Sequence, residues 1–252
     1  MRERKNMDRG VFITVEGSDG SGKTTLIECL KIWLINKKFD VITTREPGGT
    51  QLGEVLRKIL LDDHNHDGQH DAHTGISART GARTGARTGA RTGARTGARI
   101  SDQAELMLMF TARMQHLHEV ILPAMETGRC VLCDRFTDAT YAYQGGGRGI
   151  SERRIQQLED WVQQGLQPDL TIMLDVPVAV GVERTKERGI KGDRFEQQQI
   201  DFKEAVRRVY LQRAEKYPQR IKLIDATRRV ADVQNDLIRS VEAFLKARHG
   251  AL

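Results

Sequence analysis

The residues from Gly17 to Thr24 constrain the fold of this chain more than any other segment. They read Gly-Ser-Asp-Gly-Ser-Gly-Lys-Thr and match the pattern G-x-x-x-x-G-K-[ST] in full. A β-rich run precedes them at 11–16, and a stretch typical of a helix follows at 24–36. A strand, a glycine-rich turn and a helix N-terminus place successive backbone N–H groups around an anion. The segment therefore predicts a phosphate-binding loop and a nucleoside triphosphate ligand.

Each position of this loop has an expected part in binding ATP and Mg²⁺. Lys23 is expected to reach the β- and γ-phosphates, and the hydroxyl of Thr24 to help hold Mg²⁺. The expected nucleotide-binding residues are Gly17, Ser18, Asp19, Gly20, Ser21, Gly22, Lys23 and Thr24.

Other classes of phosphate-loop protein fit this chain less well than a small kinase does. The base-reading tetrapeptide Asn-Lys-x-Asp of GTPase switches is absent, and 252 residues are few for a motor or a large ATPase. A small kinase needs an acceptor pocket, an arginine clamp on the acceptor phosphate and a basic lid, because its catalysis is mostly positioning and charge neutralisation.

Strand and helix patterns alternate along most of the chain. Further strands are expected at 41–44, 129–134, 170–175 and 221–225. Helices are expected at 52–61, from a cap at Asp102 to about 118, at 151–165, from Pro177 onward, at 196–217 and up to about 246. Strands separated by helices indicate a parallel sheet covered on both faces, so we predict one α/β domain spanning 1–252.

One segment departs from this alternation. Between Ala78 and Gly97 the tetrapeptide Ala-Arg-Thr-Gly occurs five times, after a polar run at 64–73 that contains four histidines. A period of four without a large apolar residue forms no buried face, so nothing offsets the entropy of ordering it. We interpret 64–100 as a disordered, low-complexity insertion, and its histidines as a solvated run because no cysteine or fixed scaffold accompanies them.

The insertion also accounts for most of the net charge of +6. Its six arginines and two aspartates contribute +4, which leaves +2 for the rest of the chain. A nucleic-acid partner is therefore not expected. The alternative, arginine repeats that bind nucleic-acid phosphates, predicts salt-sensitive binding that disappears when 64–100 is deleted.

Composition and hydropathy favour the cytoplasm and give no membrane partner. The longest apolar stretches, such as 106–110, are far shorter than a membrane span. The charged N-terminus is followed by no apolar signal region, and the three cysteines Cys29, Cys130 and Cys133 form no disulfide framework. Cys130-x-x-Cys133 superficially matches a redox or zinc motif, but it lies inside a buried strand pattern without a second pair, which favours packing.

Several charged residues lie where a kinase needs them. Asp134 and Arg135 end a predicted strand, where a carboxylate assists Mg²⁺ through water and an arginine points into the ligand crevice; the alternative is a structural ion pair. Arg45, in the Thr-Arg-Glu-Pro-Gly-Gly-Thr segment at 44–50, is placed to bind an acceptor phosphate. Arg113 shares a helix face with Phe110, which suits stacking and reading a base but is also a common core-and-surface pair.

A basic run follows the predicted helix that starts at Pro177. Arg184, Lys186, Arg188, Lys191 and Arg194 cluster around two glycines. Such a run is often only a solvated face. In a kinase it is typical of a mobile lid whose cations close over the transferred phosphoryl group, so we expect a lid at 184–195.

Taken in order, these motifs resemble those of bacterial thymidylate kinases. The resemblance rests on the phosphate loop, the segment at 44–50, Asp134-Arg135, the Tyr-Gln-Gly-Gly-Gly-Arg-Gly segment at 143–149 and the basic lid. It implies a phosphate-loop α/β fold whose five-stranded parallel sheet has the order 2-3-1-4-5. It also implies transfer of the γ-phosphoryl group of ATP to dTMP, with Mg²⁺, by a homodimer that pairs through helices flanking the acceptor site.

The resemblance further implies roles for individual residues. Asp19 corresponds to a carboxylate near the 3′-hydroxyl of dTMP, and Arg113 to the arginine that reads the thymine edge. The positions expected around the phosphate, the base and the sugar are Arg45, Glu46, Arg57, Arg135, Thr140, Tyr143 and Gln144. The base-stacking aromatic of the family falls at Met109, with Phe110 one residue later, so either residue is a candidate to cover the base.

The catalytic cations follow from where arginines occur. The phosphate loop contains no arginine and the lid contains several, which resembles the class of the family that supplies lid arginines. The resemblance implies catalytic roles for Lys23, Arg135, Arg184 and Arg188. Two alternatives stay open: a kinase for another deoxynucleoside or its monophosphate, and a catalytically silent nucleotide binder, against which the intact Lys23 and Arg135 argue.

Overall fold

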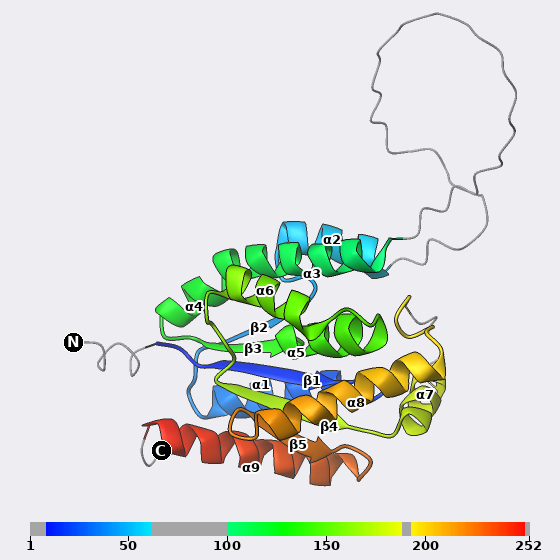
Figure 1. The fold of residues 1–252 in the computed structure, drawn as a ribbon. Helices are drawn as coiled ribbons and strands as arrows, with labels where there is room; N and C mark the ends of the chain where they lie inside the picture. Colours follow the sequence, from blue (N-terminus) through cyan, green and yellow to red (C-terminus); the bar gives the residue numbers. More distant parts are fainter. Residues whose placement is uncertain (1–8, 62–99, 188–192, 250–252) are drawn as a thin grey trace, which may run out of the picture.

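The computed structural model describes residues 9–61, 100–187 and 193–249. Five parallel strands lie at its centre (Figure 1): β1 (Phe12–Gly17), β2 (Val41–Arg45), β3 (Cys130–Asp134), β4 (Leu170–Asp175) and β5 (Ile221–Asp225). Their order is β2-β3-β1-β4-β5, which confirms the predicted sheet. The predicted insertion at 64–100, except Ile100, lies outside the described residues, as does the part of the predicted lid from 188 to 192.

The central strands are buried on both faces, and their side chains alternate between two cores. Ile13 and Val15 pack in one cluster, whereas Phe12 packs in another on the opposite face. The same alternation separates Cys130 from Cys133, because residues three apart in a strand point to opposite faces. Burial raises the pKa of both thiols. The prediction that these cysteines pack rather than act as a pair is confirmed.

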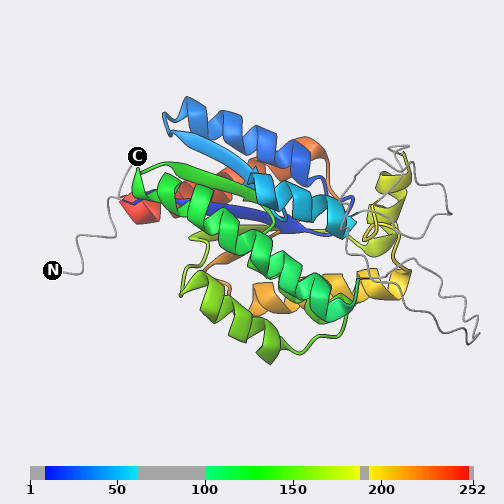
Figure 2. The same cartoon turned by 90° about the horizontal axis from the view of Figure 1, so that it is seen from above.

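Helices cover both faces of the sheet. On one face, α1 (Lys23–Asn36) and α9 (Val230–His249) pack through leucines against β1, β3 and β4. On the other face lie α3 (Asp102–His116) with its continuation and α8 (Ile200–Lys216), and Figure 2 shows the helix from 102 to 126 running across the sheet. Outside this layer, α2 (Gln51–Leu61) packs on α3, and α6 (Glu152–Gln163) and α7 (Val178–Glu187) complete the described helices of ten or more residues.

The helix that begins near residue 102 is longer than predicted, and its cap is different. Ser101 is the N-cap: its hydroxyl accepts a hydrogen bond from Ala104 N at 3.3 Å, so Asp102 is the first helical residue rather than the cap. The helix does not end at 118. It continues through a π-helical turn, η2 (Leu117–Ile121), into α4 (Leu122–Glu126), because a widened turn precedes Pro123, which has no backbone N–H to donate.

A helical segment that the sequence analysis does not predict follows β3. It consists of α5 (Thr137–Thr140) and the π-helical η3 (Tyr141–Gly147), although glycine disfavours helices. The reason is packing: a Cβ on Gly147 would lie 2.3 Å from the ring of Phe202 on α8. Glycine here lets η3 approach α8 closely, and that contact offsets its low helix propensity.

The helix α8 begins four residues later than predicted. The residues just before α8 form a turn at Asp193, whose carboxylate accepts hydrogen bonds from the backbone N–H groups of Phe195 and Glu196 at 2.9 and 3.0 Å. No helix within 9–61, 100–187 or 193–249 is long and apolar enough to cross a membrane.

Candidate active site

Two cavities open at the carboxyl edge of the sheet, where ligands of such folds bind. The loop cavity, of about 660 Å³, is lined by the phosphate loop from Asp19 to Thr24 and by Asp134, Arg135 and Arg184. The inner cavity, of about 80 Å³, is lined among others by Glu46, Met109, Arg113, Phe136, Thr140, Tyr143 and Gln144. Four residues line both cavities: Asp19, Arg57, Arg135 and Asp193. The two cavities therefore meet at one shared wall.

The phosphate loop has the backbone shape that its glycines predict. Gly20 and Gly22 have φ values of 78° and 87°, in the left-handed region that favours glycine. Lys23 folds back over the loop, and its Nζ donates to the carbonyl oxygens of Gly17 and Ser18, both at 3.0 Å. Burial, and then the charge of Arg135, lower the pKa of Lys23 to about 8. A phosphate in the loop would favour the charged form of this amine.

The loop cavity also holds oxygen atoms suited to Mg²⁺. Thr24 and Asp134 both line it, and Asp134 Oδ1 is buried without a hydrogen-bond partner among the described residues. Mg²⁺ is usually bound by one or two carboxylates together with substrate phosphates. The described ranges contain no group of three or more His, Cys, Asp or Glu residues arranged for a metal. The residues present fit Mg²⁺.

Arg135 is held firmly at the shared wall. Its φ of 67° is strained for a residue with a Cβ. Its Nη2 donates to Asp19 Oδ1 at 2.7 Å and its Nη1 to Gly17 O at 3.0 Å, while the guanidinium lies 4.9 Å from the centroid of the Tyr143 ring. This geometry places a cation between the phosphate loop and the inner cavity.

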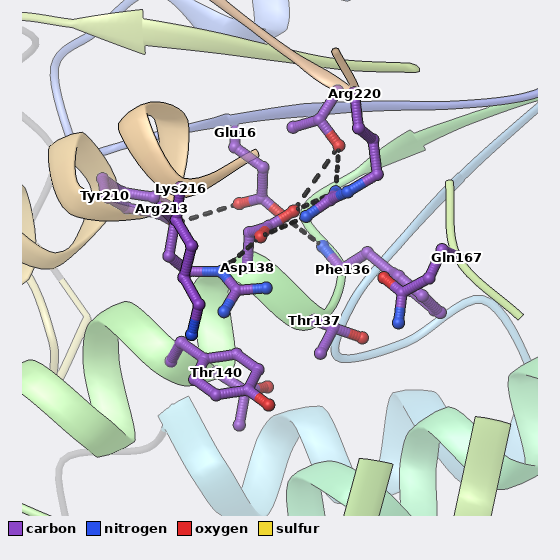
Figure 3. A network of polar contacts seen from close by, with 12 residues as sticks. Glu16, Phe136, Thr137, Asp138, Thr140, Gln167, Tyr210, Arg213, Lys216 and Arg220 are labelled. Carbon is purple, nitrogen blue, oxygen red and sulfur yellow. Dashed lines mark hydrogen bonds and ion pairs between the residues drawn. The ribbon is translucent and has the colours of Figure 1, made fainter. Parts of the chain in front are cut away.

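A buried polar network around Glu16, drawn in Figure 3, adjoins Arg135. The carboxyl group of Glu16 accepts a hydrogen bond from Phe136 N at 2.7 Å and another from the Tyr210 hydroxyl at 2.9 Å. The same hydroxyl lies 3.2 Å from Arg135 Nη1. Burial, and then the negative charge of Asp138, raise the pKa of Glu16 to about 8. Glu16 thus fixes the backbone at Phe136, next to Arg135, and it also fixes the Tyr210 hydroxyl that lies beside the Arg135 side chain.

The inner cavity contains a buried arginine with one unused donor. Arg113 Nε donates to Glu46 Oε2 at 2.7 Å, and its Nη2 donates to the Thr140 hydroxyl at 2.9 Å. Its Nη1 is buried and has no partner in the described part of the chain. Burial tends to raise the pKa of Glu46, but Arg113 and His116, whose Nδ1 lies 3.0 Å from Glu46 Oε1, hold that pKa below its ordinary value.

Comparison with known proteins identifies the family. The family model described as thymidylate kinase matches residues 15–80 and 86–237. The thymidylate kinase of Nitrosomonas europaea is 44% identical over 238 residues, which cover 94% of this chain and 95% of the relative. That of Ectopseudomonas mendocina is 45% identical over 241 residues, 96% of this chain and 99% of the relative. The chain belongs to the thymidylate kinase family.

This membership confirms the resemblance drawn from the motifs, and the matched ranges include the phosphate loop and the walls of both cavities. The interruption at 81–85 falls inside the Ala-Arg-Thr-Gly repeat. The match to the family therefore spans the whole candidate site and not one motif alone.

The structure decides which of Met109 and Phe110 lines the inner cavity. Met109 lines the inner cavity, whereas Phe110 is only 2% exposed and packs with Leu106 and Tyr141 in a separate core cluster. Phe110 is therefore not a residue of the cavity. The aromatic residues that line it are Tyr143, Phe195 and Phe136, and the sequence analysis does not include Phe136. Its signal was its position directly after Asp134-Arg135 at the end of a strand.

Three other predicted site residues, all arginines, differ in which cavity they line. Arg57 lines both cavities, with Nη1 donating to Pro47 O at 2.9 Å. Arg45, in contrast, is not among the lining residues of either cavity; it is exposed and donates to Glu54 Oε2 at 2.8 Å. Arg184 lines the loop cavity, but its Nη1 donates to Ala226 O at 2.9 Å.

The predicted lid is described only in part. Arg188 lies outside the described residues. The described end of the lid brings Asp193 and Phe195 to the inner cavity, and the sequence analysis missed both because it considered only the cations of this run. The acid within the basic run was the available signal.

Proposed function

We propose that the protein transfers the γ-phosphoryl group of ATP to dTMP, giving dTDP, with Mg²⁺. The observation that carries this proposal is the shared wall of the two cavities, formed by Asp19, Arg57, Arg135 and Asp193. A triphosphate on the phosphate loop and a monophosphate in the inner cavity would meet there. Phosphoryl transfer needs little beyond such positioning and the neutralisation of charge.

On the donor side, the phosphate loop and Lys23 would bind the β- and γ-phosphates. To reach the phosphates, the Lys23 amine would give up its two hydrogen bonds to backbone carbonyl oxygens, each 3.0 Å long. Thr24 and Asp134 would hold Mg²⁺, which supplies neutralisation of phosphate charge when bound. Arg184 and Arg188 are proposed as further transition-state cations, by analogy with the lid arginines of the family.

On the acceptor side, dTMP would lie with its base deep in the inner cavity. The Nη1 of Arg113, which has no partner among the residues that the structure describes, would donate to a base carbonyl oxygen, and Met109 and Phe136 offer apolar surface to the ring. Tyr143, with its hydroxyl 3.4 Å from Asp19 Oδ2, would lie beside the sugar. Arg135 and Arg57 would then face the acceptor phosphate at the shared wall.

We also propose that the enzyme is a cytoplasmic homodimer without a nucleic-acid partner. Large apolar side chains are exposed on α2 and α3, the two helices that flank the inner cavity: Leu52, Val55, Ile59, Met107 and Met114. Exposed apolar groups gathered on two neighbouring helices are typical of an interface. Light scattering coupled to size exclusion measures the state; a monomer at micromolar concentration would contradict the dimer.

Acceptor specificity tests the activity most directly. Wild-type protein with ATP and Mg²⁺ is offered dTMP, dUMP, dCMP, dGMP and thymidine in a coupled assay of ADP release. We expect dTMP to have the highest kcat/KM. No turnover of dTMP, with turnover of another acceptor, would replace dTMP by that acceptor; no turnover of any acceptor would leave a nucleotide binder.

A further inference from the structure

Glu105 on α3 is a fully buried carboxylate that the mechanism above does not use. Its Oε1 accepts a hydrogen bond from Gln144 Nε2 at 2.9 Å and lies 3.3 Å from Arg148 Nε. Its Oε2 accepts from Arg194 Nη2 at 2.5 Å and lies 3.3 Å from Arg148 Nη2. A buried carboxylate is costly unless it is paired and hydrogen-bonded, and two guanidinium groups provide both.

This environment fixes the orientation of one side chain of the inner cavity. A carboxylate between two guanidinium groups accepts hydrogen bonds at both oxygens and donates none. The amide of Gln144 must therefore turn its NH₂ group toward Glu105. Its amide oxygen takes no part in this cluster of described residues, and Gln144 lines the inner cavity. The oxygen is thus left for whatever occupies that cavity.

The neighbouring position in the cavity presents the opposite kind of group. Arg113, whose Nη1 is buried and unpartnered within the described ranges, is bonded to Thr140. Thr140 precedes Gln144 by four residues in the continuous helical segment of α5 and η3, so the two lie one turn apart. The inner cavity therefore offers an N–H donor and a carbonyl acceptor about one helical turn apart.

That pair matches one pyrimidine and not another. Thymine and uracil place the O4 acceptor beside the N3–H donor, whereas cytosine places an amino donor beside the N3 acceptor. We propose that Glu105 is a positioning residue for acceptor specificity: by holding the Gln144 amide oxygen toward the inner cavity, it makes the site accept thymine and reject cytosine. This inference rests on the proposed function of the site.

The substitution Glu105→Gln tests it by reversing the constraint. The new amide has one NH₂ group, which is least favoured at the Oε2 position, where Arg194 Nη2 donates at 2.5 Å and Arg148 Nη2 lies 3.3 Å away. At the Oε1 position it faces Gln144, so the Gln144 amide turns over and directs its NH₂ group into the cavity. The kcat/KM values for dTMP, dUMP and dCMP are measured for wild type and variant.

We expect the preference for dTMP over dCMP to fall by about ten- to a hundredfold, the effect of mispairing a buried polar group. The preference for dTMP over dUMP should stay unchanged, because uracil and thymine share the edge that Gln144 reads. Arg148→Lys is the matched control: it loosens the same cluster without touching the Gln144–Glu105 bond, and it should keep the wild-type preference over dCMP.

Glu105→Asp keeps the charge that the two arginines need and serves where the glutamine variant does not fold. Its shorter side chain withdraws the acceptor from Gln144, and the preference over dCMP should fall again. Equal losses for all three acceptors, or an unchanged preference over dCMP in both Glu105 variants, would overturn the positioning role alone. A wild-type enzyme that prefers dCMP would overturn the proposed function as well.

Discussion

At the scale of single residues, the site contains buried charged side chains that keep one polar atom without a hydrogen-bond partner among the described residues. Arg113 is the clearest case, since two of its nitrogens are satisfied by Glu46 and Thr140 and the third has no partner in the ranges that the structure describes. Replacing it by lysine keeps a positive charge near Glu46 but removes the planar set of donors. The spacing of Phe110 and Arg113 on one helix predicts a base-reading pair. The hydrogen bonds from Arg113 to Glu46 and Thr140 were not predictable, because these two residues come from distant segments.

We therefore expect Arg113→Lys to raise the KM for dTMP by about ten- to a hundredfold, while the KM for ATP changes little. Steady-state kinetics with each substrate varied in turn provides the measurement. Arg129→Lys, an arginine paired with the exposed Asp40 away from both cavities, is the control and should match wild type. Parallel increases in both KM values would indicate a general disturbance instead.

Glu16 is a second residue whose burial has a measurable consequence. Its pKa is raised from 4.5 to about 8, so the folded protein holds a proton there that the unfolded chain releases between those pH values. Stability contributed by this group is present below the unfolded pKa and is lost as pH rises toward 8. The loss is at most about 1.4 kcal/mol per pH unit.

Glu16→Gln should remove this pH dependence, because an amide has nothing to titrate. Urea unfolding between pH 5.5 and 7.5 should give a free energy of unfolding that falls less with pH in the variant than in wild type. Tyr210→Phe, which removes the hydroxyl that donates to Glu16 but keeps the carboxyl group, should retain the slope. An identical slope in wild type and Glu16→Gln would contradict the assignment.

At the scale of elements, helix α7 is packed directly against the phosphate loop through two glycines. A Cβ on Gly181 would lie 2.6 Å from Asp19 O, and one on Gly20 would lie 2.2 Å from Gly181 O. Alanine ordinarily stabilises a helix interior by about 1 kcal/mol relative to glycine. In Gly181→Ala the new methyl group would instead displace the loop, so we expect a higher KM for ATP and a lower melting temperature.

Ala179→Gly provides the matched comparison, since it weakens the same helix at an exposed position. It should lower the melting temperature without changing the KM for ATP. If Gly181→Ala binds ATP as wild type does, the contact between α7 and the loop does not shape the nucleotide site.

The elements also mark where sequence reasoning stops. All five strands, the phosphate loop and the helix that follows it were predictable. Their hydrophobic period, their glycine positions and their end residues are all signals within a short stretch of sequence, and these signals agree. The segment Thr137–Gly147 was not, since its helix depends on glycines that fit against α8, more than fifty residues later in the chain. The inner cavity is lined partly by this segment, which is why its geometry required the structure.

At the scale of the whole molecule, the parallel sheet brings loops from distant segments to one edge and so assembles both cavities. The end of α2 is part of this assembly: Arg194 N donates to Leu61 O at 3.3 Å, and Leu61 lines the inner cavity. The helix α3, which starts at Asp102, carries Glu105, Met109 and Arg113. The low-complexity insertion thus connects two helices that both contribute to the acceptor side.

Both helices have attachments of their own, and these do not depend on the connection. α2 packs on α3 and is tied to the lid end through Leu61, and α3 starts from its own N-cap at Ser101. Deleting the five tetrapeptides at 78–97 should therefore leave kcat and both KM values within about twofold of wild type. The deletion shortens the connection by about half, which lowers the entropic cost of closing it by only about 0.6 kcal/mol, so the stability of the fold should rise slightly.

The measurement is steady-state kinetics of the deletion variant, with DNA binding followed across a salt series. A variant of the same length in which the arginines of 78–97 are replaced by serine separates chain length from charge. A large loss of dTMP affinity in the deletion would mean that the repeat supports the acceptor site. Salt-sensitive DNA binding by wild type that both variants lose would instead give the arginines a nucleic-acid partner, because counterion release follows charge and not length.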